Sequence, residues 1–127
     1  MFNEKSLSLF GQNKRDFWNQ SRKENSTIPL LGQCSRSDPT ERVRDVCLKS
    51  LTYFDLTSGQ ASAIQQLGKS YVSAKKESQI EARKLIAIMI HNMSGGDKEL
   101  RQLVKNEKSS DLKKYIDEQL LARKVTQ

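Results

Sequence analysis

The side chains that most often carry out catalysis or hold metals are scarce in this chain. It has one histidine, His91, and two cysteines, Cys34 and Cys47, which do not form a CxxC pair. A metal site needs several ligands at matched spacing, and nucleophilic catalysis needs a Ser or Cys beside a base. The sequence therefore predicts no catalytic site, no metal and no cofactor. An enzyme whose site assembles from distant residues is kept as a third alternative.

Each of these three residues has a plain structural interpretation. Cys47 lies on the apolar stripe of a predicted helix, which favours a buried structural thiol. Two cysteines make a disulfide framework the less favoured alternative, although a Cys34–Cys47 bridge is geometrically conceivable, and they indicate a reducing compartment, cytoplasmic or, in a eukaryote, nuclear. His91 ends the most apolar segment and is interpreted as an interior or boundary histidine, not a base.

Basic residues are the more informative group. The net charge is +7, and Lys and Arg occur as doublets on or beside the predicted helices. Such doublets can neutralise phosphates and give salt-dependent, largely sequence-independent binding of nucleic acid, or they can form an ordinary solvated surface. The candidate nucleic-acid-binding residues are Lys75, Lys76, Arg83, Lys84, Lys113 and Lys114.

The C-terminal third has the outline of a helix-turn-helix. A short helix over 97–105, a polar turn over 106–109 and a longer helix from Ser110 fit that order. The turn has no glycine, and acidic residues in the second helix would lie near phosphates, so DNA reading by this pair is a minor alternative. In that geometry four side chains would face a groove of DNA: Ser110, Lys113, Lys114 and Asp117.

A second candidate surface precedes Pro39. Phe17 and Trp18 form a large apolar pair among basic residues, and an apolar segment over 28–31 interrupts a polar run over 25–40 that predicts a linker. We favour a strap packed across the helical body for this segment, with a linear docking motif as the alternative. The candidate partner-binding residues are Phe17, Trp18, Ile28, Leu30 and Leu31.

The elements that would position these residues are helices. Apolar residues recur three and four apart over 39–54, from 58 to 72, over 76–93, over 97–105 and from 110 onwards. Period-two alternation is scarce, so no strand is predicted.

Local signals mark the ends of these helices. Asp38 predicts an N-cap, with Pro39 in the first helical position, and Asp97 predicts a second N-cap. Gly95-Gly96 predicts the end of the segment over 76–93, which we expect to be the most buried helix. Gly68 indicates that a neighbouring helix passes close to it.

The sequence thus predicts an all-α protein, a compact bundle of about five helices with an extended or partly helical N-terminal arm. Residues 1–37 are predicted to be the arm and linker, and residues 38–127 the helical domain. No apolar run approaches the roughly 18 residues of a membrane span. Charged residues such as Glu4 and Lys5 argue against a signal peptide at the N-terminus.

One family resemblance is present in the helical segments. Val43-Arg44-Asp45-Val46-Cys47, then Asn92-Met93, and Glu99-Leu100-Arg101 with Val104 resemble the polymerase-binding central helical domain of transcription elongation factor S-II. The resemblance covers about half the chain. The zinc ribbon that carries that family's cleavage activity has no counterpart in this sequence.

The leading hypothesis is a non-enzymatic regulatory or adaptor protein that binds nucleic acid, or a nucleic-acid-associated complex such as a transcription complex, through basic helical faces. The alternative is a protein–protein interaction module that uses the aromatic N-terminal arm, with the lysines only keeping the chain soluble. The expected partner is nucleic acid or an acidic protein, and no membrane. The oligomeric state is left open, a homodimer included.

Overall fold

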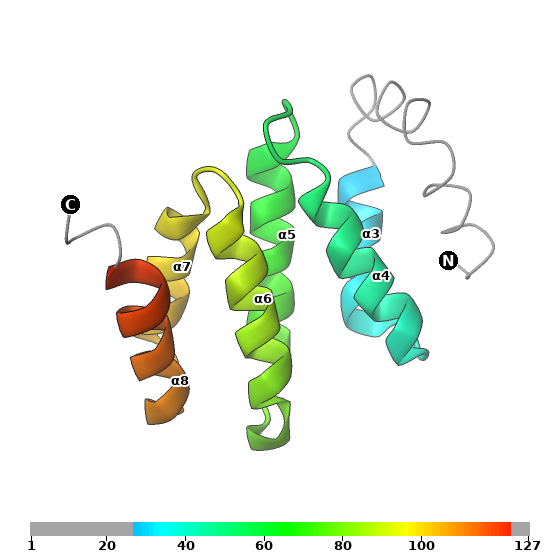
Figure 1. Ribbon diagram of the computed structural model, residues 1–127. Helices are drawn as coiled ribbons and strands as arrows, with labels where there is room; N and C mark the ends of the chain where they lie inside the picture. The colour runs from blue at the N-terminus through cyan, green and yellow to red at the C-terminus, as the bar shows by residue number, and fades with distance from the viewer. Residues whose placement is uncertain (1–26, 123–127) are drawn as a thin grey trace. The chain divides into compact units, whose positions relative to one another are not determined.

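The structure is a computed structural model that describes residues 27–122, and these residues form six α-helices and no strand. The all-α prediction is therefore confirmed. A 3-10 turn at Glu77–Gln79 precedes the fourth helix, and a π-helical segment at Ile116–Leu121 continues the last. The helices are α3 (Thr27–Ser37), α4 (Glu41–Thr52), α5 (Gln60–Ser73), α6 (Ile80–Asn92), α7 (Gly96–Lys105) and α8 (Ser110–Tyr115) (Figure 1).

The described residues belong to two compact units that divide within α5, between Gln66 and Leu67. The first unit holds α3, α4 and the start of α5, and the second holds the rest. The boundary predicted at 37/38 falls inside the first unit. Among the helices described, none combines the length and apolar character that crossing a membrane requires.

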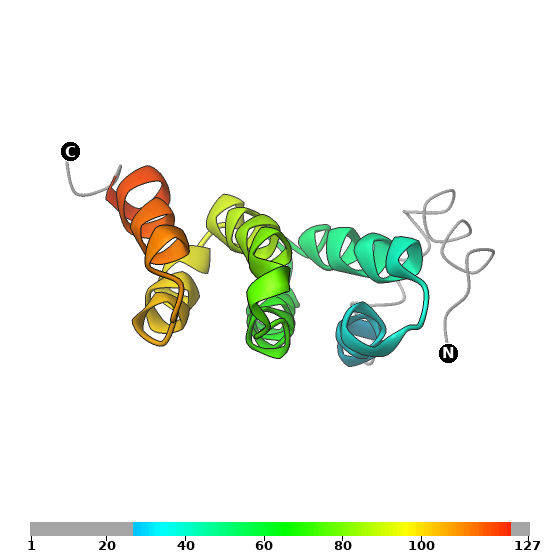
Figure 2. The ribbon, with the colours of Figure 1, turned by 90° about the horizontal axis from the view of Figure 1, so that it is seen from below.

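In the first unit, α3 packs against α4 (Figures 1 and 2). The linker prediction over 25–40 is wrong for residues 27–37, which are helical. Ile28 and Leu31 are fully buried, so the apolar segment is one stripe of a helix and not an extended strap. Pro29 is tolerated because it lies in the first turn, where the missing N–H has no partner within the helix. The last 11 residues of the predicted arm, 27–37, are therefore helical.

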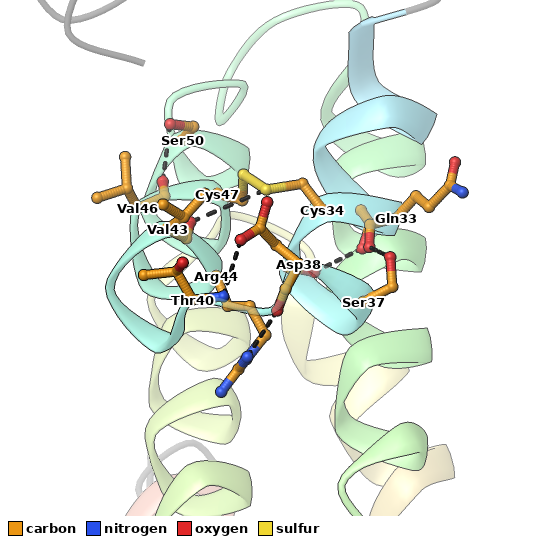
Figure 3. The surroundings of a disulfide bond; sticks show 12 residues. Gln33, Cys34, Ser37, Asp38, Thr40, Val43, Arg44, Val46, Cys47 and Ser50 are labelled. Carbon is orange, nitrogen blue, oxygen red and sulfur yellow. Dashed lines mark hydrogen bonds between the residues drawn. A yellow bond between two sulfur atoms is a disulfide. The ribbon is translucent and has the colours of Figure 1, made fainter. Parts of the chain in front are cut away.

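Asp38 organises the connection between these helices. Its Oδ1 accepts a hydrogen bond from the Thr40 amide at 2.9 Å, and its carbonyl accepts one from Arg44 Nη1 at 2.6 Å (Figure 3). Helix α4 begins at Glu41, later than predicted, because the Asp38 carboxylate closes a turn over Pro39 and does not cap a helix there.

A disulfide joins the two helices of this unit. Cys34 on α3 and Cys47 on α4 are bonded, with 6.1 Å between their Cα atoms (Figure 3). Both residues are buried, as expected for Cys47, but the prediction of reduced cysteines is wrong. The prediction is wrong because it places Cys34 in a linker, whereas Cys34 lies on the buried side of α3, which packs against α4.

In the second unit, α6 packs against α7 and against the π-helical segment, which also contacts α7. The expectation that α6 is the most buried helix is wrong, because four of its 13 residues are buried, against five of ten in α7. Helix α6 buries one face, which includes Ile86 and Ile90, whereas Leu85 is 45% exposed.

The corner between α6 and α7 lies at Gly95-Gly96, as predicted. Gly95 has a left-handed φ of 79°. A Cβ on Gly96 would lie 1.8 Å from the Ile90 carbonyl oxygen. The prediction that Asp97 is an N-cap is wrong, because Gly95 holds that position and Asp97 lies in the first turn of α7. Its Oδ1 is 2.8 Å from His91 Nδ1, so Asp97 links α7 to the end of α6.

Gly68 also has the close neighbour that the sequence indicated. A Cβ at this position would lie 2.3 Å from Oε2 of Glu99 on α7. The nearest atom belongs to the end of a flexible side chain, so the Glu99 side chain could move aside if Gly68 were replaced.

Candidate nucleic-acid interface

The C-terminal helices follow the predicted order of helix, polar turn and helix, and the second is the longer only when the π-helical segment at Ile116–Leu121 is counted with α8. The Ser109 hydroxyl accepts a hydrogen bond from the Leu112 amide at 3.3 Å and caps α8. Glu107 Oε2 accepts one from the Ser109 amide at 2.9 Å. The side chains of Glu107 and Ser109 therefore stabilise the turn that joins α7 to α8.

A groove of about 560 Å³ runs between α7 and α8 with its π-helical extension. Val104 and Leu121 form an apolar floor and are both nearly buried. We call this feature the α7–α8 groove. Four charged side chains line it, all of them exposed: Arg101, Lys105, Lys113 and Asp117.

The charges of the α7–α8 groove are predominantly positive, three cations against one carboxylate. Arg101 and Lys105 are four residues apart on α7 and so lie on one face of the helix. Within residues 27–122, Arg101, Lys105 and Lys113 form no hydrogen bond or ion pair with another described side chain. Their charges are available to an anion that enters the groove.

The predicted nucleic-acid-binding residues do not all share this surface. Lys113 lines the α7–α8 groove, and Lys114 is exposed on α8. Lys75 and Lys76 are exposed between α5 and the 3-10 turn. The Lys84 Nζ lies 4.4 Å from the centre of the Tyr115 ring, a cation–π contact that links α6 to α8.

The prediction that Arg83 binds nucleic acid is wrong, because its side chain is not available to a phosphate. Its side chain is 6% exposed. Nε and Nη2 donate to the two carboxylate oxygens of Glu107, at 3.0 and 3.1 Å, and Nη1 donates to the carbonyls of Ala74 and Lys76. Arg83 therefore holds the start of α6 to the turn after α7. Its partner is distant in sequence, so the pattern of basic doublets could not reveal this role.

Glu107 is the acceptor at the centre of this network. Burial alone would raise the pKa of its carboxyl, but hydrogen bonds from Tyr71, the Ser109 amide and Arg83 outweigh burial and hold the pKa below its ordinary value. Burial and the Glu107 carboxylate raise the pKa of Tyr71, whose hydroxyl donates to Oε1 of Glu107. The network is thus an ionised pair with a neutral tyrosine.

Arg101 and Lys105 are the residues that the sequence analysis missed. The sequence prediction depends on adjacent basic doublets, whereas these two cations are spaced by about one helical turn. Their spacing of four residues, on either side of the apolar position Val104, was the signal that could have found them.

The proposed arm residues have different outcomes. Phe17 and Trp18 lie outside the described residues. Ile28 and Leu31 are buried within the first unit and cannot reach a partner without unfolding α3. Leu30 is 52% exposed and is the one described member of this set that a partner can reach.

The described residues contain no group of three or more metal-ligating side chains, and the sulfurs of both cysteines are bonded to each other. His91, paired with Asp97, has a structural role at the α6–α7 corner. The chain matches no protein-family model, no curated protein and no solved structure, so the resemblance to the S-II domain has no support from these comparisons.

Proposed function

We propose that the chain is a non-enzymatic regulatory protein that binds nucleic acid through the α7–α8 groove. The observation that carries the proposal is the cluster of Arg101, Lys105 and Lys113 around one groove, three exposed cations that have no partner within residues 27–122. Such a cluster provides what phosphate binding needs, because each cation that neutralises a phosphate releases condensed counterions.

The expected binding mode is contact with the sugar-phosphate backbone. Lys and Arg at a helix surface fix position on a nucleic acid without reading bases. With three phosphate contacts, the slope of log affinity against log salt for duplex DNA is about −3. A transcription-type complex is then the setting in which a weak, sequence-independent contact would act.

The test compares two double charge reversals by fluorescence anisotropy with a labelled duplex of arbitrary sequence. Lys105→Glu/Lys113→Glu alters the α7–α8 groove, and Lys49→Glu/Lys69→Glu alters exposed lysines on α4 and α5 outside it. Both variants lower the net charge of +7 by the same amount. We expect the groove variant to lose at least about tenfold in affinity, which is about 1.4 kcal/mol, and the control variant to lose much less.

Two results would overturn this function. One is no binding of the unaltered chain at about 50 mM salt, where phosphate contacts are strongest. The other is an equal loss in both variants, which would show that net charge and not the α7–α8 groove attracts the duplex.

The alternative, a protein–protein module that uses the N-terminal arm, needs a redesigned truncation. Helix α3 is bonded to α4 through Cys34, so a deletion that reaches residue 36 would damage the first unit. Removal of residues 1–26 keeps α3 and tests Phe17 and Trp18, and Leu30→Glu tests the exposed position on α3. Loss of partner capture in both variants, with duplex binding absent, would favour this alternative.

The cellular compartment of the chain is also a proposal that can be tested. A cytoplasmic or nuclear location was predicted from reduced cysteines, and the Cys34–Cys47 disulfide removes that basis, because disulfides persist mainly in oxidising compartments. Alkylation of free thiols in the native host, before lysis, distinguishes the two: a chain that resists alkylation until it is reduced lies in an oxidising compartment.

A further inference from the structure

A second pocket, of about 410 Å³, lies in the second unit and shares no lining residue with the α7–α8 groove. Residues from the end of α5, the start of α6 and the turn after α7 line it. We call it the Tyr71 pocket. Its volume falls within the range of small-molecule sites, roughly 300–1,000 Å³.

The Tyr71 pocket has an apolar wall that is partly open to solvent. Tyr71 and Leu103 are nearly buried, but Val72 is 49% exposed. Covering Val72 with an apolar group would remove that surface from water, which stabilises a bound ligand in proportion to the area covered.

The ion pair of Arg83 and Glu107 forms a second part of the lining, next to Tyr71. Its polar atoms are bonded within the protein, to each other, to Tyr71 and to backbone groups, so it adds little net charge and has no donor to spare. This part of the lining gives the pocket a fixed shape.

Three other charges line the Tyr71 pocket. Lys75 and Lys108 are exposed cations without partners among the described residues, and Glu77 is the single acid besides Glu107. With the Arg83–Glu107 pair balanced, the remaining charge is positive. The Asn106 side chain adds an uncharged donor at the same rim.

We propose that the Tyr71 pocket binds a small organic anion with an apolar body, such as an aromatic carboxylate or an aryl phosphate. The apolar body packs against Val72 and Leu103, and the anionic group faces Lys75 and Lys108. This site does not depend on the nucleic-acid proposal. A ligand here contacts the turn over 106–109, which positions α8.

The experiment is a titration of the 15N-labelled full chain with phenyl phosphate, followed by amide chemical shifts. Inorganic phosphate and benzyl alcohol are titrated separately, because each carries one half of the proposed chemistry. We expect saturable shifts for amides of residues 71–77 and 103–109 with phenyl phosphate, and at least fivefold weaker binding of either half.

Variants then test the cations. Lys75→Glu/Lys108→Glu is expected to weaken phenyl phosphate binding at least tenfold, and Lys49→Glu/Lys69→Glu, outside the pocket, to leave it within twofold. Four results would each overturn the proposal. The shifts could fail to saturate, or they could centre on residues outside the pocket. Inorganic phosphate or benzyl alcohol could bind with equal affinity, or the pocket variant could bind phenyl phosphate as tightly as the unaltered chain. Duplex binding by the same variants separates this site from the α7–α8 groove.

Discussion

Arg83 demonstrates how a basic residue in a doublet can belong to the core. Replacing it with alanine leaves Glu107 buried at 3% exposure of its side chain without its cation. We expect Arg83→Ala to lower the free energy of unfolding by about 3–5 kcal/mol, the usual cost of breaking one half of a buried pair. Urea unfolding measures it, with the exposed Lys76→Ala as the control, expected within about 0.5 kcal/mol of the unaltered chain. A loss below about 1 kcal/mol in Arg83→Ala would mean that the pair is solvated.

Glu107 gives the same pair a dependence on pH. Because its pKa in the fold is lower than in the unfolded chain, about 4.3, the unfolded chain binds the proton first as the pH falls. Its contribution to stability is complete above that unfolded value and is lost as the pH falls through the folded pKa.

The measurement is the difference in unfolding free energy between the unaltered chain and Glu107→Gln, followed from neutral to acid pH. We expect this difference to be largest near neutrality and to shrink below about pH 4.3, as the carboxylate is protonated. A constant difference over this range would contradict a depressed pKa for Glu107.

At the scale of single residues, the sequence predicted local roles and missed distant partners. Cys47, Leu51 and Phe54 are buried as the helical spacing indicated. The roles of Arg83 and Cys34 depend on Glu107 and Cys47, which contact them only after the helices pack. No spacing rule along the chain contains that information.

At the scale of elements, the corner between α6 and α7 provides a matched pair of glycines. Gly95→Ala meets no atom within 4 Å but must adopt a left-handed φ, which costs about 1–2 kcal/mol. Gly96→Ala places its Cβ against the Ile90 carbonyl, a backbone atom that cannot move alone.

We therefore expect Gly96→Ala to lower the free energy of unfolding by about 2 kcal/mol or more. This loss is expected to exceed that of Gly95→Ala. Thermal unfolding of both variants measures the difference. Equal losses would show that α7 shifts away from α6 without cost and that the close approach is not required.

The disulfide is the second element-scale feature with a measurable effect. Cys34 and Cys47 are 13 residues apart, and closing a loop of this size stabilises the folded chain by about 3 kcal/mol, largely by restricting the unfolded state. We expect a phosphine reductant to lower the urea midpoint of the unaltered chain by an amount that corresponds to about 3 kcal/mol in the free energy of unfolding. In Cys34→Ala/Cys47→Ala the same reductant is expected to change nothing, and a fall there would indicate an effect unrelated to the bridge.

The ends of helices were predictable to within a few residues, but two departures have physical causes. Helix α3 was hidden because five of its 11 residues are the Ser, Thr, Gly and Pro that also form linkers. The π-helical segment was hidden because its wider turn changes the helical phase, which lets both Leu120 and Leu121 be buried.

At the scale of the whole molecule, the spacing of apolar residues predicted an all-α chain and the composition predicted an excess of positive charge, and the described residues have both properties. Where the cations gather could not be predicted, because the α7–α8 groove takes residues from two helices joined by a turn. The net charge of +7 indicates attraction to anions in general. Only the placement of Arg101, Lys105 and Lys113 around one groove makes a particular surface testable.

The bridge between Cys34 and Cys47 also changes what a protease can release. The connection at Pro39 and Thr40 is exposed and lies between the two bonded cysteines. A cut there breaks the backbone, yet both fragments stay covalently attached, and everything N-terminal of the cut travels with the remainder. Proteolysis and reduction must act together to free the N-terminal segment, so its release would require two separate chemical events.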